Sequence, residues 1–286
     1  MSVELHPVIP LVIAAALMPF ARPTGRLMLA MAGPVAALAA VIMLPADAHW
    51  SVNVIGQELV LLEVTRIGRL FAFAFTAYGF VAALYATSQR GLGGRFWSMM
   101  LVIGGTGVTL VGDWLSLLLF WEMLAVASAF LVWRGRDPQS QAAGFRYIMV
   151  HVAGGVCLLG GAMFQIQAGS TLIEPLHLSD GLGPWLILIG MAVNAAVVPL
   201  HAWLPDAYPR ATIYGTVFLA AFTTKSAVYI LARTFPGEEV LMWAGAIMTV
   251  YGVYFALLEN NIRRLLGYHI VSQVGYMVCG VGIGTA

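Results

Sequence analysis

Lys225 is the residue best suited to acid–base chemistry in this sequence, because it is the only lysine among 286 residues and lies within a long apolar segment. If a helix begins near Thr212, Lys225 lies about 20 Å along it, which is too deep for its ammonium group to reach the surface easily. A charge at that depth costs roughly 2.5–3.5 kcal/mol on insertion scales unless it faces a partner or water. Such an amine can bind and release a proton, or it can form a structural ion pair that joins two helices.

Glu122 is the candidate partner of Lys225, since it lies about 13 Å from Asp113 along its own apolar segment and therefore at a similar depth. Moving the carboxylate toward or away from the lysine changes how tightly the lysine holds its proton. The pair could thus convert a conformational or electrical signal into proton movement. The alternative is a protonated Glu122 that only bonds a neighbouring backbone group.

His151 is a third polar residue within an apolar segment, and Gly154 and Gly155 follow it closely. Small residues let membrane helices approach one another, and an imidazole can relay protons near neutral pH. A histidine packed in a core with its hydrogen bonds satisfied fits the same pattern. Both interpretations stay open at this point.

The segment from Asn194 to Asp206 contains Pro199 and Pro205, so it cannot form an uninterrupted helix without losing backbone hydrogen bonds. Interrupted helices at membrane depth are tolerated where they line a polar cavity. Because Asn194 precedes the interruption and His201 lies within it, we expect a cavity that handles ions. An ordinary proline kink is the alternative.

The composition places these residues in a membrane protein. Hydrophobic residues make up 60% of the chain and charged residues only 9%, where a soluble protein has about 25%. A soluble nucleotide-binding domain is therefore excluded, and a net charge of +1 without a run of basic residues gives no sign of nucleic-acid binding. Cys157 and Cys279 lie within apolar segments, so we expect neither a disulfide scaffold nor a metal site, and we expect no cofactor.

Apolar segments separated by charged, glycine or proline residues predict an all-helical, polytopic protein, because about 20 residues cross a bilayer. The longest interruption is 46–66, and its mixture of polar and β-branched residues predicts a short hairpin over one face. The first segment lacks the basic start of a secretory signal, so we expect it to be retained as a helix. The sequence predicts ten spans, at about residues 5–21, 25–45, 67–88, 94–111, 114–133, 141–168, 182–204, 212–235, 239–258 and 262–285.

Arginine residues predict the orientation, because cytoplasmic loops carry an excess of basic residues. If the ten spans alternate, the loops with Arg90, Arg134 and Arg263 lie on one side, which should be cytoplasmic. The opposite loops carry most of the acidic residues, among them Glu174 and Glu238. Both termini should then face outward from the cytoplasmic (inner) membrane.

Several motifs resemble those of one known family. Residues 199–207, which read PLHAWLPDA, resemble the PLHxWLPDA signature of the proton-translocating antiporter-like subunits shared by respiratory complex I, membrane-bound hydrogenases and Mrp-type sodium/proton antiporters. Residues 113–122 resemble the fifth helix of that family, and residues 263–268 and 272–276 resemble its tenth-helix motif. The resemblance extends over about residues 95–285, with the motifs in the family's order.

This resemblance implies roles for individual residues. Glu122 matches the essential glutamate on the family's fifth helix, and Lys225 matches the lysine on its eighth helix. Asn194 stands where the family has a lysine on its seventh helix, and an amide cannot carry charge. Family members usually continue into a second, inverted bundle, so we expect a split or truncated member whose second bundle is completed by another chain.

The expected fold is antiporter-like with an interrupted seventh helix. It comprises helices 1–3 in residues 1–93, a five-helix bundle of helices 4–8 in residues 94–235, and the start of a second bundle in residues 236–286. We expect translocation of protons, or of a cation coupled to protons, by a subunit of a multisubunit respiratory or antiporter complex. The expected path is lined by Glu122, Lys225, His151, His201 and Asn194.

Three other functions fit the same residues: an Mrp-like secondary antiporter driven by ion gradients alone, a membrane subunit of an energy-coupled inorganic-carbon uptake system, and a structural subunit that does not pump. Asn194 is the best support for the structural subunit. Any NADH or quinone chemistry would belong to partner subunits, since the chain has no redox motif. The expected partners are other membrane subunits, the lipid bilayer, protons and, as an alternative ion, Na+.

Overall fold

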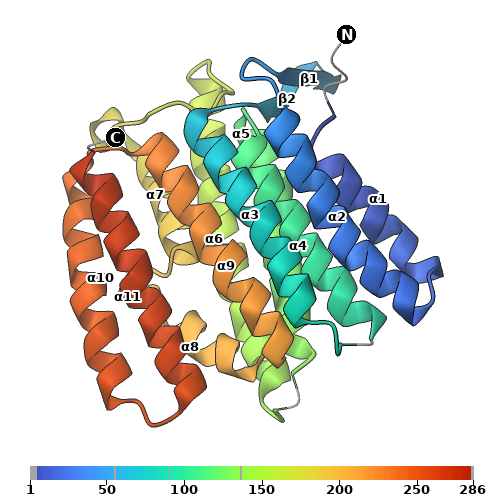
Figure 1. Ribbon diagram of the computed structural model, residues 1–286. Coiled ribbons are helices and arrows are strands. Elements are labelled where there is room, and N and C mark those ends of the chain that lie inside the picture. Colours follow the sequence, from blue (N-terminus) through green and yellow to red (C-terminus); the bar gives the residue numbers. More distant parts are fainter. Residues whose placement is uncertain (1–4, 55, 90, 136, 285–286) are drawn as a thin grey trace. The chain divides into compact units, whose positions relative to one another are not determined.

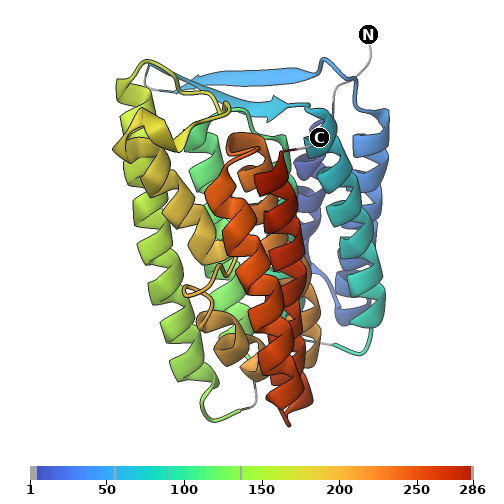
Figure 2. The same ribbon diagram turned by 90° about the vertical axis from the view of Figure 1, so that its left-hand side faces the viewer.

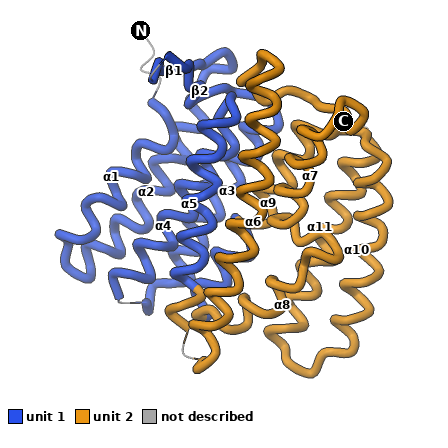
Figure 3. Tube along the Cα trace, turned by 180° about the vertical axis from the view of Figure 1, so that it is seen from behind, with its two compact units in different colours: residues 1–131, 213–222 blue, residues 132–212, 223–286 orange. Residues whose placement is uncertain are grey.

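The computed structural model describes residues 5–54, 56–89, 91–135 and 137–284, which form a predominantly helical protein (Figure 1). Arg90, on which part of the predicted orientation rests, lies outside the described residues. The chain divides into two compact units, Met1–Leu131 with Ile213–Phe222 (unit 1) and Val132–Thr212 with Thr223–Ala286 (unit 2) (Figure 3). The division expected at residues 93 and 235 stays a prediction.

Seven of the described helices are long and apolar enough to cross a membrane, and α1 and α7 are shorter apolar helices. The total of ten spans stays a prediction. Unit 1 contains α1 (Val8–Leu17), η1 (Met18–Phe20), α2 (Pro23–Met43), β1 (His49–Val54), β2 (Gln57–Glu63), α3 (Arg66–Tyr85), α4 (Leu92–Leu110), most of α5 (Trp114–Trp133) and the first part of α9 (Ile213–Thr234). Unit 2 contains the ends of α5 and α9 with α6 (Ser140–Gln167), η2 (Leu178–Asp180), α7 (Leu182–Asn194), α8 (Trp203–Ala207), η3 (Tyr208–Arg210), α10 (Glu239–Leu258) and α11 (Ile262–Ile283).

Strands β1 and β2 form the hairpin predicted over residues 46–66. They pair antiparallel, from His49 opposite Glu63 to Val54 opposite Gln57. Gly56 has a φ of 78° at the tip, a backbone conformation that glycine adopts without steric cost. The described chain is thus mostly helical, as predicted, with strands in the segment whose mixture of polar and β-branched residues predicted a hairpin.

The carboxylate of Asp113 binds β2 to the start of α5. Asp113 accepts hydrogen bonds from the backbone amides of Leu115 and Ser116, each at 2.9 Å, and from that of Val60 in β2 at 2.7 Å. The residue is 0% exposed, and these three N–H donors offset the cost of burying its charge. The hairpin is thus fixed over one end of unit 1.

His6 binds the same strand to the start of α1. Its Nε2 lies 2.9 Å from the carbonyl of Leu61, and its Nδ1 accepts a hydrogen bond from the amide of Val8 at 3.1 Å. Because a carbonyl only accepts, Nε2 carries the hydrogen, so both ring nitrogens are used by the neutral imidazole. Burial lowers the pKa of His6 below its usual value.

Two helix pairs in unit 2 pack closely at glycine residues. A Cβ at Gly190 of α7 would come within 2.7 Å of the carbonyl of Gly154 in α6, so the close approach predicted at Gly154 is present. A Cβ at Gly245 of α10 would come within 2.2 Å of the amide nitrogen of Cys279 in α11. Helices α10 and α11 therefore touch along their backbones, and they lie side by side in Figure 2 (orange and red).

Candidate functional site

Helix α7 ends at Asn194 and α8 begins at Trp203, and residues 195–202 between them are called the interruption below. That the two helices are parts of one interrupted membrane helix stays a prediction. The amide of Ala196 donates to the carbonyl of Val193 at 3.1 Å, and the amide of Val197 donates to that of Ala192 at 2.9 Å. These two bonds form a Schellman motif, in which Ala196 takes the positive φ, here 54°, that glycine usually supplies. Carbonyls at the end of α7 are thus bonded within the protein.

Trp203 joins the two sides of the interruption. Residues 195–202 form a series of turns, and α8 begins at Trp203. The indole Nε1 donates to the carbonyl of Val193 at 2.9 Å, and the side chain is 4% exposed. A hydrogen bond in the protein interior therefore holds the start of α8 against the end of α7.

The Asn194 side chain is buried at this end of α7, with only 5% exposed. No described residue donates a hydrogen bond to its Oδ1. A buried amide oxygen of this kind can accept a bond from a proton-carrying water, but the amide itself does not titrate. Asn194 could therefore orient a proton path without storing a proton.

His151 is fixed in one orientation on α6. Its Nδ1 donates to the carbonyl of Tyr147 at 2.9 Å, and its ring stacks on that of Tyr147 with centroids 3.8 Å apart. The ring of Trp203 meets it at 4.5 Å with an angle of 77°. Since Nδ1 carries the hydrogen, Nε2 holds the basic lone pair, and no described residue bonds to Nε2. His151 is 1% exposed, so a proton-accepting nitrogen is held inside the protein.

His201 lies within the interruption and is 8% exposed. Its Nε2 is 3.0 Å from the hydroxyl of Tyr251 on α10, and the two rings meet edge to face at 4.7 Å. A pocket of about 370 Å³ opens beside this pair. Its lining is mostly polar and consists of His201, Ala202, Pro205, Asp206, Arg210, Tyr251, Arg264 and Tyr268.

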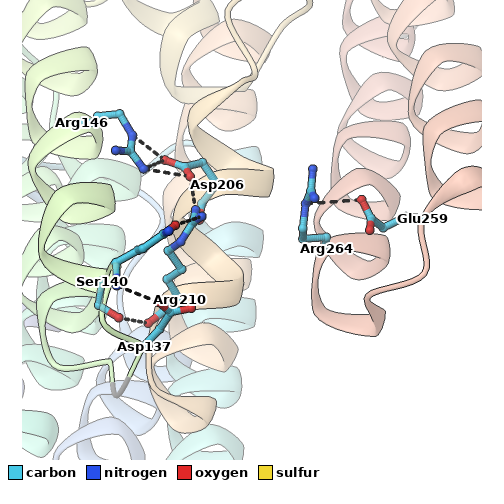
Figure 4. Close-up of polar contacts among 8 residues, drawn as sticks. Asp137, Ser140, Arg146, Asp206, Arg210, Glu259 and Arg264 are labelled. Atoms are coloured by element: carbon cyan, nitrogen blue, oxygen red, sulfur yellow. Dashed lines mark hydrogen bonds and ion pairs between the residues drawn. The ribbon is translucent and has the colours of Figure 1, made fainter.

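Asp206 is the centre of a charged network next to this pocket (Figure 4). Arg146 of α6 donates to both carboxylate oxygens, at 2.8 and 3.0 Å, and Arg210 also pairs with Asp206. Arg210 reaches Gln139 at 2.7 Å, and the hydroxyl of Ser140 donates to the carbonyl of Arg210 at 2.8 Å. The network fixes α8 and η3 to the start of α6. Its pair between Arg146 and Asp206 is bidentate, a geometry that the arginine side chain provides.

Lys225 lies in unit 2 on α9, and Glu122 lies in unit 1 on α5. Both residues are partly buried. Thr224 and Ser226 on either side of Lys225 are fully buried, and no described residue bonds either hydroxyl oxygen. Helix α9 therefore has four polar side chains in succession, Thr223 to Ser226, within a segment apolar enough to cross a membrane.

The predicted residues of unit 2 are partly brought together. His151 and the end of α7, which carries Asn194, meet at Trp203. The hydrogen bond of His201 goes instead to Tyr251, which the sequence analysis missed. Tyr251 is 50 residues from His201 and is one of several aromatic residues in its segment, so no local pattern distinguishes it.

Comparison with known proteins gives a consistent result. The family described as "NADH:quinone oxidoreductase/Mrp antiporter, TM" matches residues 111–286. NADH-quinone oxidoreductase subunit M of Pseudomonas aeruginosa is 32% identical over 264 residues, which cover 82% of this chain and 51% of that protein. A Na(+)/H(+) antiporter subunit of Alkalihalophilus pseudofirmus is 30% identical over 207 residues, or 65% of this chain and 41% of that protein.

Solved structures show the same similarity. A chain of the membrane-bound sulfane sulfur reductase, an archaeal respiratory membrane complex, matches with a TM-score of 0.86 and 25% identity, covering 99% of this chain and 52% of that one. A chain of the Mrp complex from Dietzia sp. matches with a TM-score of 0.86 and 25% identity, covering 98% of this chain and 34% of that one. The chain thus spans about half the length of the curated relatives it matches first, 51% and 50%.

Proposed function

Because the chain belongs to the NADH:quinone oxidoreductase/Mrp antiporter transmembrane family, we propose that it translocates protons, or a cation coupled to protons, as an antiporter-like subunit of a multisubunit membrane complex. In this proposal α7 and α8 are the two parts of an interrupted seventh membrane helix. Other membrane subunits are its partners, including a chain that completes the second bundle, and the membrane is the cytoplasmic one.

The fixed orientation of His151 is the observation that best supports a proton path. Its Nδ1 is committed to the carbonyl of Tyr147, while Nε2 lies buried without a bond to any described residue. The imidazole can take a proton at Nε2 and return it from the same atom without turning. A histidine that served packing alone would not need a buried basic nitrogen left open in this way.

The other predicted residues complete the proposal. Lys225 stores and releases the proton, and the charge of Glu122 adjusts how tightly the lysine holds it. Asn194 and His201 orient the path at the interruption. Asn194 also supports the second candidate, a structural subunit that does not pump, because it cannot carry the charge that a lysine would carry there.

The test uses inside-out membrane vesicles that contain the full-length protein with its natural subunits, energised by NADH or by a sodium gradient. We expect Lys225→Met to abolish proton transport per assembled complex. Lys225→Arg should fail nearly as badly, because a guanidinium does not give up its proton. Glu122→Gln should lower transport, whereas the control Glu174→Gln, at an exposed carboxylate outside the helices, should leave it unchanged.

If the chain is instead a structural subunit that does not pump, another pattern is expected. Either single change would then lower the amount of assembled complex, and Glu122→Gln combined with Lys225→Met would restore it. A double variant that assembles and transports normally would overturn the proton-carrying role of both residues. Inorganic-carbon uptake is not proposed, because the two relatives described above are subunits of an NADH-quinone oxidoreductase and of a sodium/proton antiporter.

A further inference from the structure

The position of His201 is set by a residue outside the interruption. His201 lies in a turn between α7 and α8, where no helical rotamer preference fixes its imidazole. The hydroxyl and ring of Tyr251 on α10 contact it, at 3.0 Å for the hydrogen bond and 4.7 Å between ring centroids. The hydrogen bond and the ring contact with Tyr251 therefore help to set the direction of Nε2.

The side chain of Tyr251 is held in place by the packing of α10 against α11. Its ring packs on that of Phe255 at 4.5 Å, and Phe255 in turn stacks on Tyr268 of α11 at 5.5 Å. A Cβ at Gly252, the neighbour of Tyr251, would come within 2.5 Å of the amide nitrogen of Ser272. The two helices are in backbone contact at the level of Tyr251, so its hydroxyl is presented from a rigid element.

The charged groups around His201 are already bonded to other partners. Asp206 of α8 is held by Arg146 and Arg210, and Arg264 of α11 pairs with Glu259 at 3.3 Å. Arg210 and Tyr268 complete the titratable groups that line the pocket beside His201. Within the described chain, Tyr251 is the group that bonds Nε2 of His201.

We propose that Tyr251 is a positioning residue, whose hydroxyl holds the imidazole of His201 in the orientation in which it exchanges protons with the translocation path. The inference rests on the proposed translocation function. A phenol hydroxyl both donates and accepts, so it can donate to Nε2 of the neutral imidazole and accept from Nε2–H of the protonated one. Through this bond α10 influences proton exchange at the interruption between α7 and α8.

The test compares Tyr251→Phe with Tyr254→Phe on the same helix, where Tyr254 is 59% exposed and serves as the matched control. Proton transport per assembled complex is measured against pH in vesicles that contain the complete complex. The bond from the protonated, charged imidazole is the stronger of the two, so loss of the hydroxyl should move the midpoint of the pH profile by about half to one pH unit. The control should keep the wild-type midpoint.

A second comparison identifies His201 as the group affected. In the His201→Gln background, Tyr251→Phe should cause no further shift of the midpoint, because the two residues act through one bond. If Tyr251→Phe does not assemble, 3-fluorotyrosine at position 251 keeps the size of the side chain and makes its hydroxyl more acidic, and it should still move the midpoint.

The possible failures are distinguishable. A wild-type complex that moves no protons would overturn the proposed function, and this inference with it. A wild type that transports, with unchanged pH profiles for Tyr251→Phe or for fluorotyrosine, would overturn only the role of Tyr251. Equal shifts with and without His201 would also overturn it, since Tyr251 would then act elsewhere.

Discussion

The indole of Trp203 donates a hydrogen bond of 2.9 Å to the carbonyl of Val193, and this bond crosses the interruption between α7 and α8. The same indole packs against His151, so one side chain connects the end of α7, the start of α8 and α6. A buried bond in this place does more than add stability, because it also fixes the surroundings of a proposed proton carrier.

Trp203→Phe should therefore lower the free energy of unfolding by about 1–3 kcal/mol, since it removes the bond and part of a buried ring. Thermal unfolding of the purified protein in detergent measures the change. Trp185→Phe is the matched control, because Trp185 is 41% exposed on α7. Equal stability of the Trp203 and Trp185 variants would contradict the role given to Trp203.

The Schellman motif at the end of α7 predicts a difference between two neighbouring alanines. Ala195 and Ala196 are both 0% exposed, but only Ala196 has a positive φ. Substitution by glycine removes the same methyl group at both sites, and at Ala196 it also removes the steric cost of the left-handed conformation. Ala196→Gly should thus be more stable than Ala195→Gly by about 1–2 kcal/mol, as measured by unfolding of both variants. The reverse order would show that the left-handed conformation is absent in solution.

The contact between His6 and the hairpin should make the stability of the hairpin depend on pH. The lowered pKa of His6 means that the unfolded chain binds a proton more readily than the folded one, because burial disfavours the charged imidazolium. Protonation of Nδ1 would also remove the acceptor used by Val8. The stability from this contact is present above about pH 6.5 and is lost as the pH falls toward the lowered value. As the pH is lowered from 7.5 to 5, proteolysis of the segment 46–66 should become faster. The rate is compared at each pH with that of an unfolded peptide of the same sequence.

The matched variants are His6→Gln and His49→Gln, the latter at an exposed histidine of the same hairpin. The first should remove most of the pH dependence, and the second should retain it. A hairpin equally resistant at both pH values in the wild-type protein would rule out the His6 contact as a pH-dependent one.

The arginine distribution predicts that the loops holding Arg134 and Arg263 face the cytoplasm. Single cysteines at Pro138, Asn260 and Glu174, all exposed, are introduced after Cys157 and Cys279 are replaced by serine. An impermeant maleimide applied to intact spheroplasts should label only the cysteine at Glu174. Labelling at Pro138 or Asn260 under these conditions would reverse the predicted orientation.

Much of the fold was predictable because its causes are local. Pro199 cannot continue a helix, and α7 ends before it, at Asn194, while Pro205 lies in the first turn of α8, where a proline is tolerated. The hairpin over 46–66 followed from a mixture of polar and β-branched residues, and the glycines at 154 and 155 indicated a close helix contact, found at Gly154. Such features depend on the backbone preferences of a few consecutive residues.

The surroundings of the site residues were decided by tertiary structure. His201 could have met any of the polar or aromatic residues of α10, and Asp206 could have paired with several arginines. The rotation of α10 about its axis is set by backbone contact with α11 at Gly245, and this rotation presents Tyr251 to His201. Similarly, Arg146 reaches Asp206 across 60 residues of sequence. The sequence by itself determined which residues carry charge and where helices stop, whereas the partner of each polar group depended on how helices rotate against one another, which no local pattern encodes.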